Sequence, residues 1–231
     1  MKRLFRHELK FALTAEQAAE AKKWARTHLE VDPHTPKGSR HYELQTLYLD
    51  NERMDVFHSQ LPARGVKYRI RRYGNEPIAY LERKKRKGTR VTKRRSSFPI
   101  ERLDDILSRT KKLKGWAKRF QQLVRNYSLE PMVLMSYQRA AFVGSDAARL
   151  TIDWRICAET SSEITSLSMN GDSVSASNEI VLELKYNGDT MPECFNEIMA
   201  LLPRQPVGFS KYGKGVQSLG IASPPLEANN G

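Results

Sequence analysis

Basic side chains recur at every second position along several stretches of this chain. Lys67, Arg69 and Arg71, for example, alternate with apolar residues. Successive side chains of a β-strand point to opposite faces, so such a segment would carry its cations on one face. The same polar face is expected to hold Arg149, Thr151, Asp153 and Arg155 in one segment, Glu183 and Lys185 in a second, Glu82 and Lys84 in a third, and Tyr137 and Arg139 in a fourth. Guanidinium and ammonium groups bind phosphate oxygens and carboxylates bind Mg²⁺ or Mn²⁺, so this face suits a chain of phosphates with a divalent metal.

Strands must position these residues. The alternation, with turn signals at Gly74 and Gly88, predicts strands at 5–13, 42–50, 66–73, 78–87, 90–98, 132–143, 149–156 and 179–186. Helices are predicted at 15–29, 101–125 and 191–202, with a short helical stretch at 51–59. The pattern is that of a single α+β domain over residues 1–220, dominated by an antiparallel sheet of about eight strands.

Three segments fall outside these elements. We expect a mobile Ser-rich loop at 161–177, a turn-rich stretch at 203–220 and a disordered tail at 221–231.

Two arrangements of the sheet remain open. For any one strand, a solvated outer face of a β-sandwich is the simpler interpretation. Repeated over several strands, however, a face of Arg and Lys repels itself, and it is stable only if something anionic lies against it. If the sheet closes into a barrel with this face inward, the result is a basic lumen whose apolar exterior is covered by helices.

The composition agrees with a polyanion as ligand. The chain has 231 residues with 39 Lys and Arg against 26 Asp and Glu, a formal net charge of +13. Its apolar content excludes wholesale disorder. No apolar run approaches the roughly 20 residues of a membrane-spanning helix, and the N-terminus has no signal-peptide core. With only two cysteines, we expect a soluble protein of the reducing cytoplasm.

Eight short motifs lie in order between Arg6 and Gly215. They are RHELKF from Arg6, LYLDN from Leu47, KYRIRRYG from Lys67, LERK from Leu81, YQR from Tyr137, RLTID from Arg149, LELKY from Leu182 and FSKYGKG from Phe209. In these motifs the chain resembles a VTC domain, the polyphosphate polymerase module of the vacuolar transporter chaperone family and its bacterial relatives. That family lies within the CYTH-like superfamily of triphosphate tunnel metalloenzymes.

The resemblance implies an antiparallel β-barrel tunnel with helices packed outside it. It also implies an enzyme that transfers the γ-phosphate of ATP to a growing inorganic polyphosphate chain, using Mn²⁺ or Mg²⁺. The phosphate-binding set at matching positions is Lys10, Arg69, Arg71, Lys84, Lys93, Arg139, Arg149, Lys211 and Lys214, with Tyr137 as a hydrogen-bonding partner and Glu183 as the metal-binding carboxylate. Glu8, Glu82 and Lys185 are expected on the same inward faces as further partners of the metal or the phosphates. Arg94 and Arg95 offer alternative registers to Lys93.

Two departures from the superfamily affect the predicted activity. Arg6 stands where other branches have the first Glu of a Glu-x-Glu-x-Lys strand, which favours the polymerase branch over cyclases and thiamine triphosphatases. The eukaryotic complex also has membrane helices that this sequence lacks, so any membrane association is expected through partner proteins. We expect Arg69→Ala or Arg139→Ala to abolish turnover and leave the fold intact.

Three other functions are compatible with the sequence. A tunnel triphosphatase would need the same phosphate-binding residues, with water as the acceptor. A non-catalytic polyphosphate-binding module would retain them without turnover. The basic hairpin from Arg83 to Arg95 could bind nucleic-acid backbones without specificity, although no aromatic stacking platform accompanies it.

Overall fold

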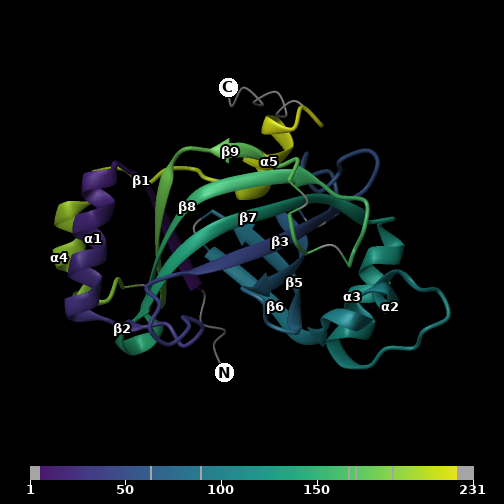
Figure 1. The fold of residues 1–231 in the computed structure, drawn as a ribbon, viewed down its shortest axis with the longest axis horizontal. Coiled ribbons are helices and arrows are strands. Elements are labelled where there is room, and N and C mark those ends of the chain that lie inside the picture. The colour runs from purple at the N-terminus through teal and green to yellow at the C-terminus, as the bar shows by residue number, and fades with distance from the viewer. Residues whose placement is uncertain are drawn as a thin grey trace.

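An antiparallel sheet forms most of the molecule (Figure 1). The computed structural model describes residues 6–62, 64–88, 90–165, 167–169, 171–188 and 190–222. The strands in this part of the chain are β1 (Arg6–Leu13), β2 (Glu30–Val31), β3 (Tyr42–Asp50), β4 (Val66–Tyr73), β5 (Ile78–Lys87), β6 (Arg90–Pro99), β7 (Glu130–Val143), β8 (Arg149–Thr160), β9 (Val174–Ser177) and β10 (Ile180–Asn187). The helices are α1 (Ala15–His28), α2 (Asp104–Leu107), α3 (Gly115–Asn126), α4 (Asn196–Leu201) and α5 (Lys211–Ser218).

Eight of the described strands close into a barrel. They follow one another in the order β7-β3-β4-β5-β6-β1-β10-β8, and β8 pairs again with β7. The short strands β2 and β9 extend the sheet beside β7 and β8. The expected antiparallel barrel with helices packed outside it is therefore confirmed, and the sandwich is excluded.

One seam of the barrel, between β6 and β1, is described over two residue pairs. Among the described residues, β6 pairs with β1 at two positions only, Val91 with Arg6 and Arg90 with His7. By contrast, β6 pairs with β5 along its whole length, from Arg90 to Pro99. The described part of β1 begins at Arg6, so the structure describes this seam at these two pairs.

Helices cover the outer face of the barrel at its two ends (Figure 1). At one end, α1 and α4 pack on the outward apolar residues of β1, β8 and β10, among them Phe11, Ile152 and Leu182. A capping box starts α1, because Thr14 accepts from the backbone of Gln17 and the Gln17 side chain accepts from the backbone of Thr14. At the other end, α3 packs on β5 and β6 and its Phe120 meets Tyr68 of β4, and α2 packs against α3. Burying the apolar faces under helices leaves the charged faces of the strands to line the interior.

Helix α5 closes off part of one end of the barrel, a role that the sequence did not predict for the stretch at 203–220. Gly215 allows the close approach, since an added Cβ would collide with the side chains of Met135 and Val133 on β7. These two residues share the inward face of β7 with Tyr137, because their positions differ by multiples of two. Tyr212 of α5 donates to Asp50 at 2.6 Å.

Other segments also differ from the prediction. Residues 51–59 form turns, not a helix. The Ser-rich stretch contributes β9 and buries Ile164 and Leu167, so much of it is packed against the barrel. Of the expected disordered tail, residues 223–231 lie outside the described part, whereas Ile221 and Ala222 pack against the core. None of the helices among the described residues is long and apolar enough to cross a membrane.

Candidate functional site

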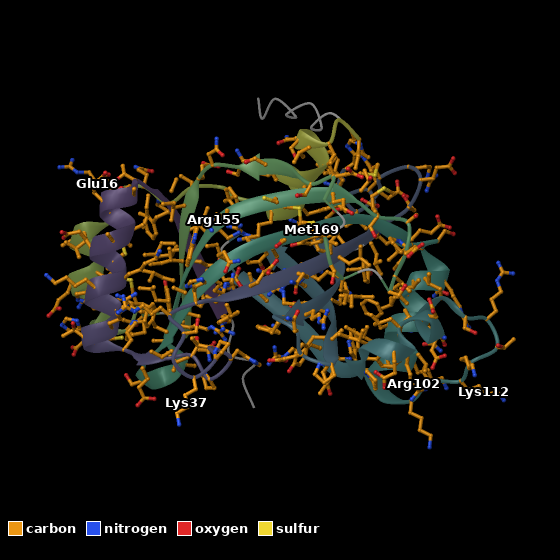
Figure 2. The ribbon with its side chains drawn as sticks, in the orientation of Figure 1. Glu16, Lys37, Arg102, Lys112, Arg155 and Met169 are labelled. Atoms are coloured by element: carbon orange, nitrogen blue, oxygen red, sulfur yellow. The ribbon has the colours of Figure 1, made fainter. Side chains whose placement is uncertain are left out.

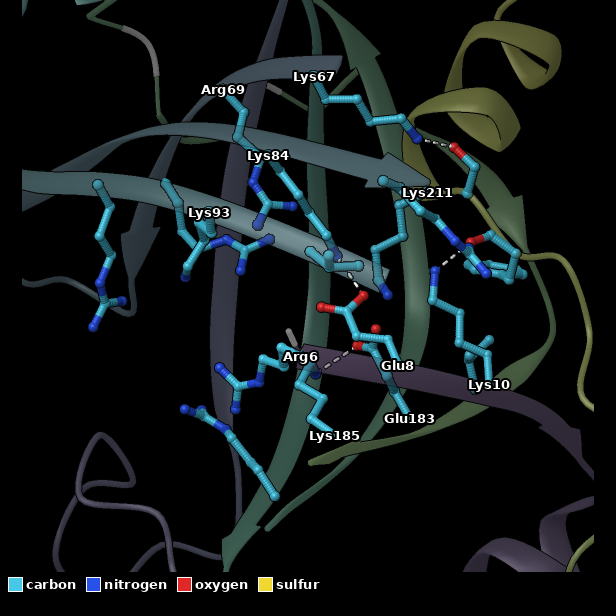
Figure 3. A pocket seen from close by; sticks show the side chains of 18 of the residues that line it. Arg6, Glu8, Lys10, Lys67, Arg69, Lys84, Lys93, Glu183, Lys185 and Lys211 are labelled. Carbon is cyan, nitrogen blue, oxygen red and sulfur yellow. Dashed lines mark hydrogen bonds and ion pairs between the residues drawn. The ribbon is translucent and has the colours of Figure 1, made fainter. Parts of the chain in front are cut away.

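The barrel encloses a cavity of about 530 Å³ (Figure 3). In the described part of the chain it is lined by seven arginines and six lysines but only two glutamates. The cations are Arg6, Lys10, Lys67, Arg69, Arg71, Lys84, Arg86, Lys93, Arg95, Arg139, Arg149, Lys185 and Lys211. The cavity is therefore strongly positive and suited to an anion that carries several charges.

The strand alternation places these groups as the sequence predicted. Nine of the ten cations named as phosphate or cofactor ligands line the cavity, and so do Tyr137, Glu8 and Glu183. The register question in β6 is also settled, since Lys93 and Arg95 line the cavity. Arg6, Lys67, Arg86, Arg95, Tyr48, Tyr73 and Ser210 line it too, and were not among the predicted site residues. The alternation in β4 predicted that Lys67 faces inward, but the phosphate-binding set implied by the family resemblance did not include it.

Lys214 lies elsewhere. Its side chain is 42% exposed and its Nζ is 3.2 Å from Glu179, outside the residues that line the cavity. Lys211, at the start of α5, does line the cavity. Of the two lysines in the FSKYGKG motif, the structure thus brings only Lys211 to the phosphate-binding candidates.

Arg155 also departs from the predicted pattern. It was expected on the polar face with Asp153, but it has a positive φ of 50° and is exposed (Figure 2). The β7–β8 register shifts at this point, where Ser136 pairs with Cys157 and Gln138 with Trp154. The bulge turns the Arg155 side chain out of the alternation.

Two carboxylates face the cavity side by side. Glu8 of β1 and Glu183 of β10 lie on adjacent, paired strands, and both line the cavity. Lys84 Nζ is 2.6 Å from Glu8 Oε2, and Lys185 Nζ is 2.5 Å from Glu183 Oε2 (Figure 3). Burial alone would raise the pKa of Glu183, but Lys185, Lys84 and Lys10 hold that pKa well below its usual range. Glu183 is thus ionised.

One oxygen of Glu183 is left without a partner. Among the described residues, its Oε1 is a buried polar atom that makes no hydrogen bond. Within the described residues, no group of three or more His, Cys, Asp or Glu side chains is placed so that it could hold a metal ion. Mg²⁺ and Mn²⁺ sites formed with phosphates often use only one or two carboxylates, because waters and phosphate oxygens complete the coordination. The residues therefore fit such a metal at Glu183, with Glu8 beside it.

Glu82 does not fit the expected role of metal ligand. It is 0% exposed and lies outside the cavity lining. One of its oxygens is 2.6 Å from Arg69 Nη2, and the other is 3.0 Å from Lys93 Nζ. Burial would raise the pKa of Glu82, but Arg69, then Arg71 and Lys93, bring it far below its ordinary value. Glu82 therefore holds two cavity cations in place.

Asp153 has the same function on the opposite wall. It accepts from Arg139 at both oxygens, at 2.6 and 2.7 Å, and from Lys211 Nζ at 2.5 Å. The carboxylate is 1% exposed. Asp32, which follows β2, holds Arg149 at 2.8 Å in a similar way. Asp32 could not have been found from strand alternation, because it belongs to a loop that reaches Arg149 only in the folded chain.

Several cavity cations have no carboxylate partner among the described residues. Lys10 donates to the Phe209 carbonyl at 2.5 Å, Lys67 donates to Ser210 Oγ at 2.6 Å, and Arg71 donates to Tyr137 OH at 3.0 Å. Burial lowers the pKa of Lys10 and of Lys67 to about 8, against the partial opposition of Glu183 and Tyr48 respectively. The burial of these charges is unfavourable without a counter-anion, so they are available to stabilise a bound anion.

Tyr48 is a further lining residue that sequence analysis missed. Its ring stacks on Tyr212 of α5 with centroids 4.9 Å apart, and its hydroxyl is 3.4 Å from Arg69 Nη1. Burial would raise the pKa of Tyr48, but Arg69 and Lys67 outweigh it and bring the value to about 7. Its hydroxyl is one more polar group directed at the phosphate-binding candidates.

Comparison with solved structures supports the fold. A putative adenylyl cyclase from Hippeastrum, described as having a dominant triphosphatase activity, is similar with a TM-score of 0.53 and 13% identity, over 96% of this chain and 98% of that one. A putative adenylate cyclase from Vibrio parahaemolyticus is similar with a TM-score of 0.50 and 14% identity, over 91% and 97% of the two chains. No protein of curated function matches the sequence.

A family model settles the classification. The VTC domain model matches residues 5–220, which is nearly the whole of the described barrel with its helices. The match contains all the residues that line the cavity. The chain belongs to the VTC domain family.

Proposed function

We propose that this protein is a polyphosphate polymerase that transfers the γ-phosphate of ATP to the end of an inorganic polyphosphate chain. The observation that carries the proposal is the excess of cations in one enclosed cavity, thirteen against two glutamates among the described lining residues. At an effective dielectric constant of about 20, two unit charges 4 Å apart repel by roughly 4 kcal/mol. Bringing two polyanions into contact therefore needs many fixed cations, more than a single small anion would require.

The reaction needs no side-chain nucleophile. A terminal oxygen of the acceptor chain attacks the γ-phosphorus of ATP, a new P–O bond forms, and the bond to the β–γ bridging oxygen breaks to release ADP. The work of the protein is to align the two phosphates and to neutralise their charge. Arg71, Lys67 and Lys10 are suited to this because no carboxylate among the described residues neutralises them.

Glu183 and Glu8 would hold the divalent metal. A bound Mn²⁺ or Mg²⁺ would supply further charge neutralisation on the transferring phosphate. Lys185 and Lys84 keep the two carboxylates oriented toward the cavity, and the low pKa of Glu183 keeps that carboxylate ionised.

A tunnel triphosphatase is the second candidate. The similar Hippeastrum protein is described as having a dominant triphosphatase activity, and hydrolysis would use the same cations and metal. Arg6 argues for the polymerase. It lines the cavity as a cation where other branches of the superfamily have a carboxylate, and its buried Nε has no hydrogen-bond partner among the described residues. Compared with those branches, Arg6 adds an anion-binding group near Glu8 and takes the place of a metal ligand.

The implied partners are ATP and inorganic polyphosphate, with no specific nucleic acid. We propose the cytoplasm, where ATP is available, as the site of the reaction, with any association with a membrane coming from partner proteins.

The experiment is to incubate purified protein with γ-labelled ATP and Mn²⁺, with and without a short polyphosphate primer, and to separate the products on a polyacrylamide gel. A ladder of labelled polyphosphate with stoichiometric ADP is the expected result. Free orthophosphate without a ladder would establish the triphosphatase. No consumption of ATP would leave a binding module. Arg71→Gln is the inactive variant, and Lys37→Gln, which removes an exposed charge far from the cavity, is its control.

A further inference from the structure

A second basic hollow lies outside the barrel, where α3 approaches β6. It has a volume of about 550 Å³ and is lined by Lys93, Arg94, Arg95, Gly115, Trp116 and Arg119. Four of these residues are cations and none is acidic. We call this hollow the α3 groove. Its charge is available to a ligand, because Arg94 and Arg119 are exposed and neither forms an ion pair with a carboxylate among the described residues.

The walls of the α3 groove are held in place. Trp116 donates its indole N–H to the Leu81 carbonyl of β5 at 2.9 Å, which fixes the start of α3 against the barrel. The guanidinium of Arg94 lies 5.8 Å from the centre of the Trp116 ring. Arg119 lies near the start of the same helix and donates to Gln122 at 3.3 Å. An anion would thus meet cations on a supported surface.

The α3 groove adjoins the barrel cavity and shares part of its lining. Lys93 and Arg95 line both the cavity and the α3 groove. Lys93 and Arg95 therefore stand between the interior of the barrel and the α3 groove. At the α5 end, in contrast, the packing of Gly215 against Met135 covers the interior. A linear anion that fills the cavity therefore has a cationic route outward past Lys93 and Arg95.

We propose that the α3 groove is a binding site for the part of a polyphosphate chain that extends out of the cavity past Lys93 and Arg95. The proposal rests on the proposed function, since only an enzyme that handles long chains needs a site beyond the cavity. Short anions such as tripolyphosphate occupy the cavity alone, whereas a long chain also contacts Arg94 and Arg119. The α3 groove therefore contributes to affinity in proportion to chain length.

The test is equilibrium binding without ATP, so that it does not depend on catalysis. Isothermal titration calorimetry compares tripolyphosphate with polyphosphate of several tens of units, for the wild type and for the double variant Arg94→Gln, Arg119→Gln. The control is Lys37→Gln, Arg40→Gln, which removes the same charge from exposed positions outside both hollows. Lys37 lies away from the α2–α3 end of the molecule, which Arg102 and Lys112 mark (Figure 2). Thermal melts confirm that both double variants are folded.

The α3-groove variant is expected to bind long polyphosphate roughly five- to thirtyfold more weakly than the control, with tripolyphosphate binding unchanged. Its long-chain affinity should also depend less steeply on salt. Equal losses for the two ligands would overturn the proposal, because the effect would then act through the cavity. The proposal would also be overturned if the α3-groove variant bound long polyphosphate as tightly as the control variant. If single-stranded DNA lost affinity and polyphosphate did not, the α3 groove would be a nucleic-acid site instead. If the protein were not a polymerase, the labelled-ATP assay would show it, whereas the difference in long-chain affinity between the two double variants would be unaffected.

Discussion

The ammonium of Lys185 lies 2.5 Å from Oε2 of Glu183, two residues earlier on the same strand, and Oε1 of that carboxylate has no hydrogen-bond partner in the described part of the chain. One oxygen is therefore fixed by the protein and the other is directed toward a ligand. This arrangement keeps Glu183 charged and in place before any metal binds.

Replacing Glu183 should abolish the metal response. Glu183→Gln keeps the shape of the side chain and can still accept from Lys185, but it removes the negative charge next to the proposed metal. We expect turnover to fall by at least about 100-fold and the Mn²⁺ concentration for half-maximal rate to rise. Initial rates over a Mn²⁺ titration measure both. An unchanged Mn²⁺ requirement would show that the metal binds elsewhere.

Arg139→Ala should unfold the protein more easily, contrary to the expectation from sequence that the fold would be left intact. The sequence showed that Arg139 stands outside the apolar core, but not that it neutralises Asp153, which is 1% exposed. Removing one partner of a buried pair costs about 3 kcal/mol, here reduced by Lys211, which still binds Asp153. Urea unfolding measures the loss. Arg71→Gln is the control, because Arg71 has no carboxylate partner among the described residues and should lose activity with little change in stability.

The empty protein should become more stable as the pH rises above 8. Burial, together with the charges of Lys10, Lys84 and Arg69, depresses the pKa of Lys67 from 10.5 to about 8, against the partial opposition of Tyr48. Between these two values the unfolded chain holds a proton that the folded chain has lost. Stability then rises with pH by up to about 1.4 kcal/mol per unit for such a group.

Urea unfolding at pH 7 and pH 9 tests this, with Lys67→Met as the comparison. The variant removes the group responsible, so its stability should be higher at pH 7 and should change less with pH. Wild-type polyphosphate binding should weaken over the same interval as Lys67 loses its charge. A wild-type stability that falls from pH 7 to pH 9 would contradict the assignment.

Gly215 should be indispensable for placing α5. A Cβ at this position meets Met135 and Val133, so Gly215→Ala forces the helix away from β7. We expect a loss of about 1–3 kcal/mol in the free energy of unfolding. Activity should fall as well, because Lys211 at the start of α5 loses its position. Gly208→Ala is the matched control, since nothing lies within 4 Å of its added Cβ.

Much of the barrel could be predicted because strand alternation is a local signal. In β4, Lys67, Arg69 and Arg71 point inward and Tyr68 and Ile70 pack outward, as the period of two requires. The family motifs then indicated which inward residues bind phosphate. Closure of the sheet, in contrast, depends on the β7–β8 pairing between distant segments, and the alternation of any one strand was also compatible with a sandwich.

The partners of the cations could not be predicted. Glu82 and Glu183 both stand on inward faces, yet one is enclosed by Arg69 and Lys93 and the other keeps a free oxygen. That difference depends on three-dimensional packing around each carboxylate. Asp32 is similar, because it meets Arg149 only through the fold. Helix α5 was missed because two glycines and a short length give it a weak local signal.

The most direct test of the account is a crystal structure with Mn²⁺ and a non-hydrolysable ATP analogue, with anomalous diffraction to locate the metal. The predicted result is an anomalous peak within coordination distance of Glu183 Oε1, with the triphosphate bound among Lys67, Arg71 and Lys10. A metal bound away from Glu183, or a triphosphate bound outside the barrel cavity, would contradict it.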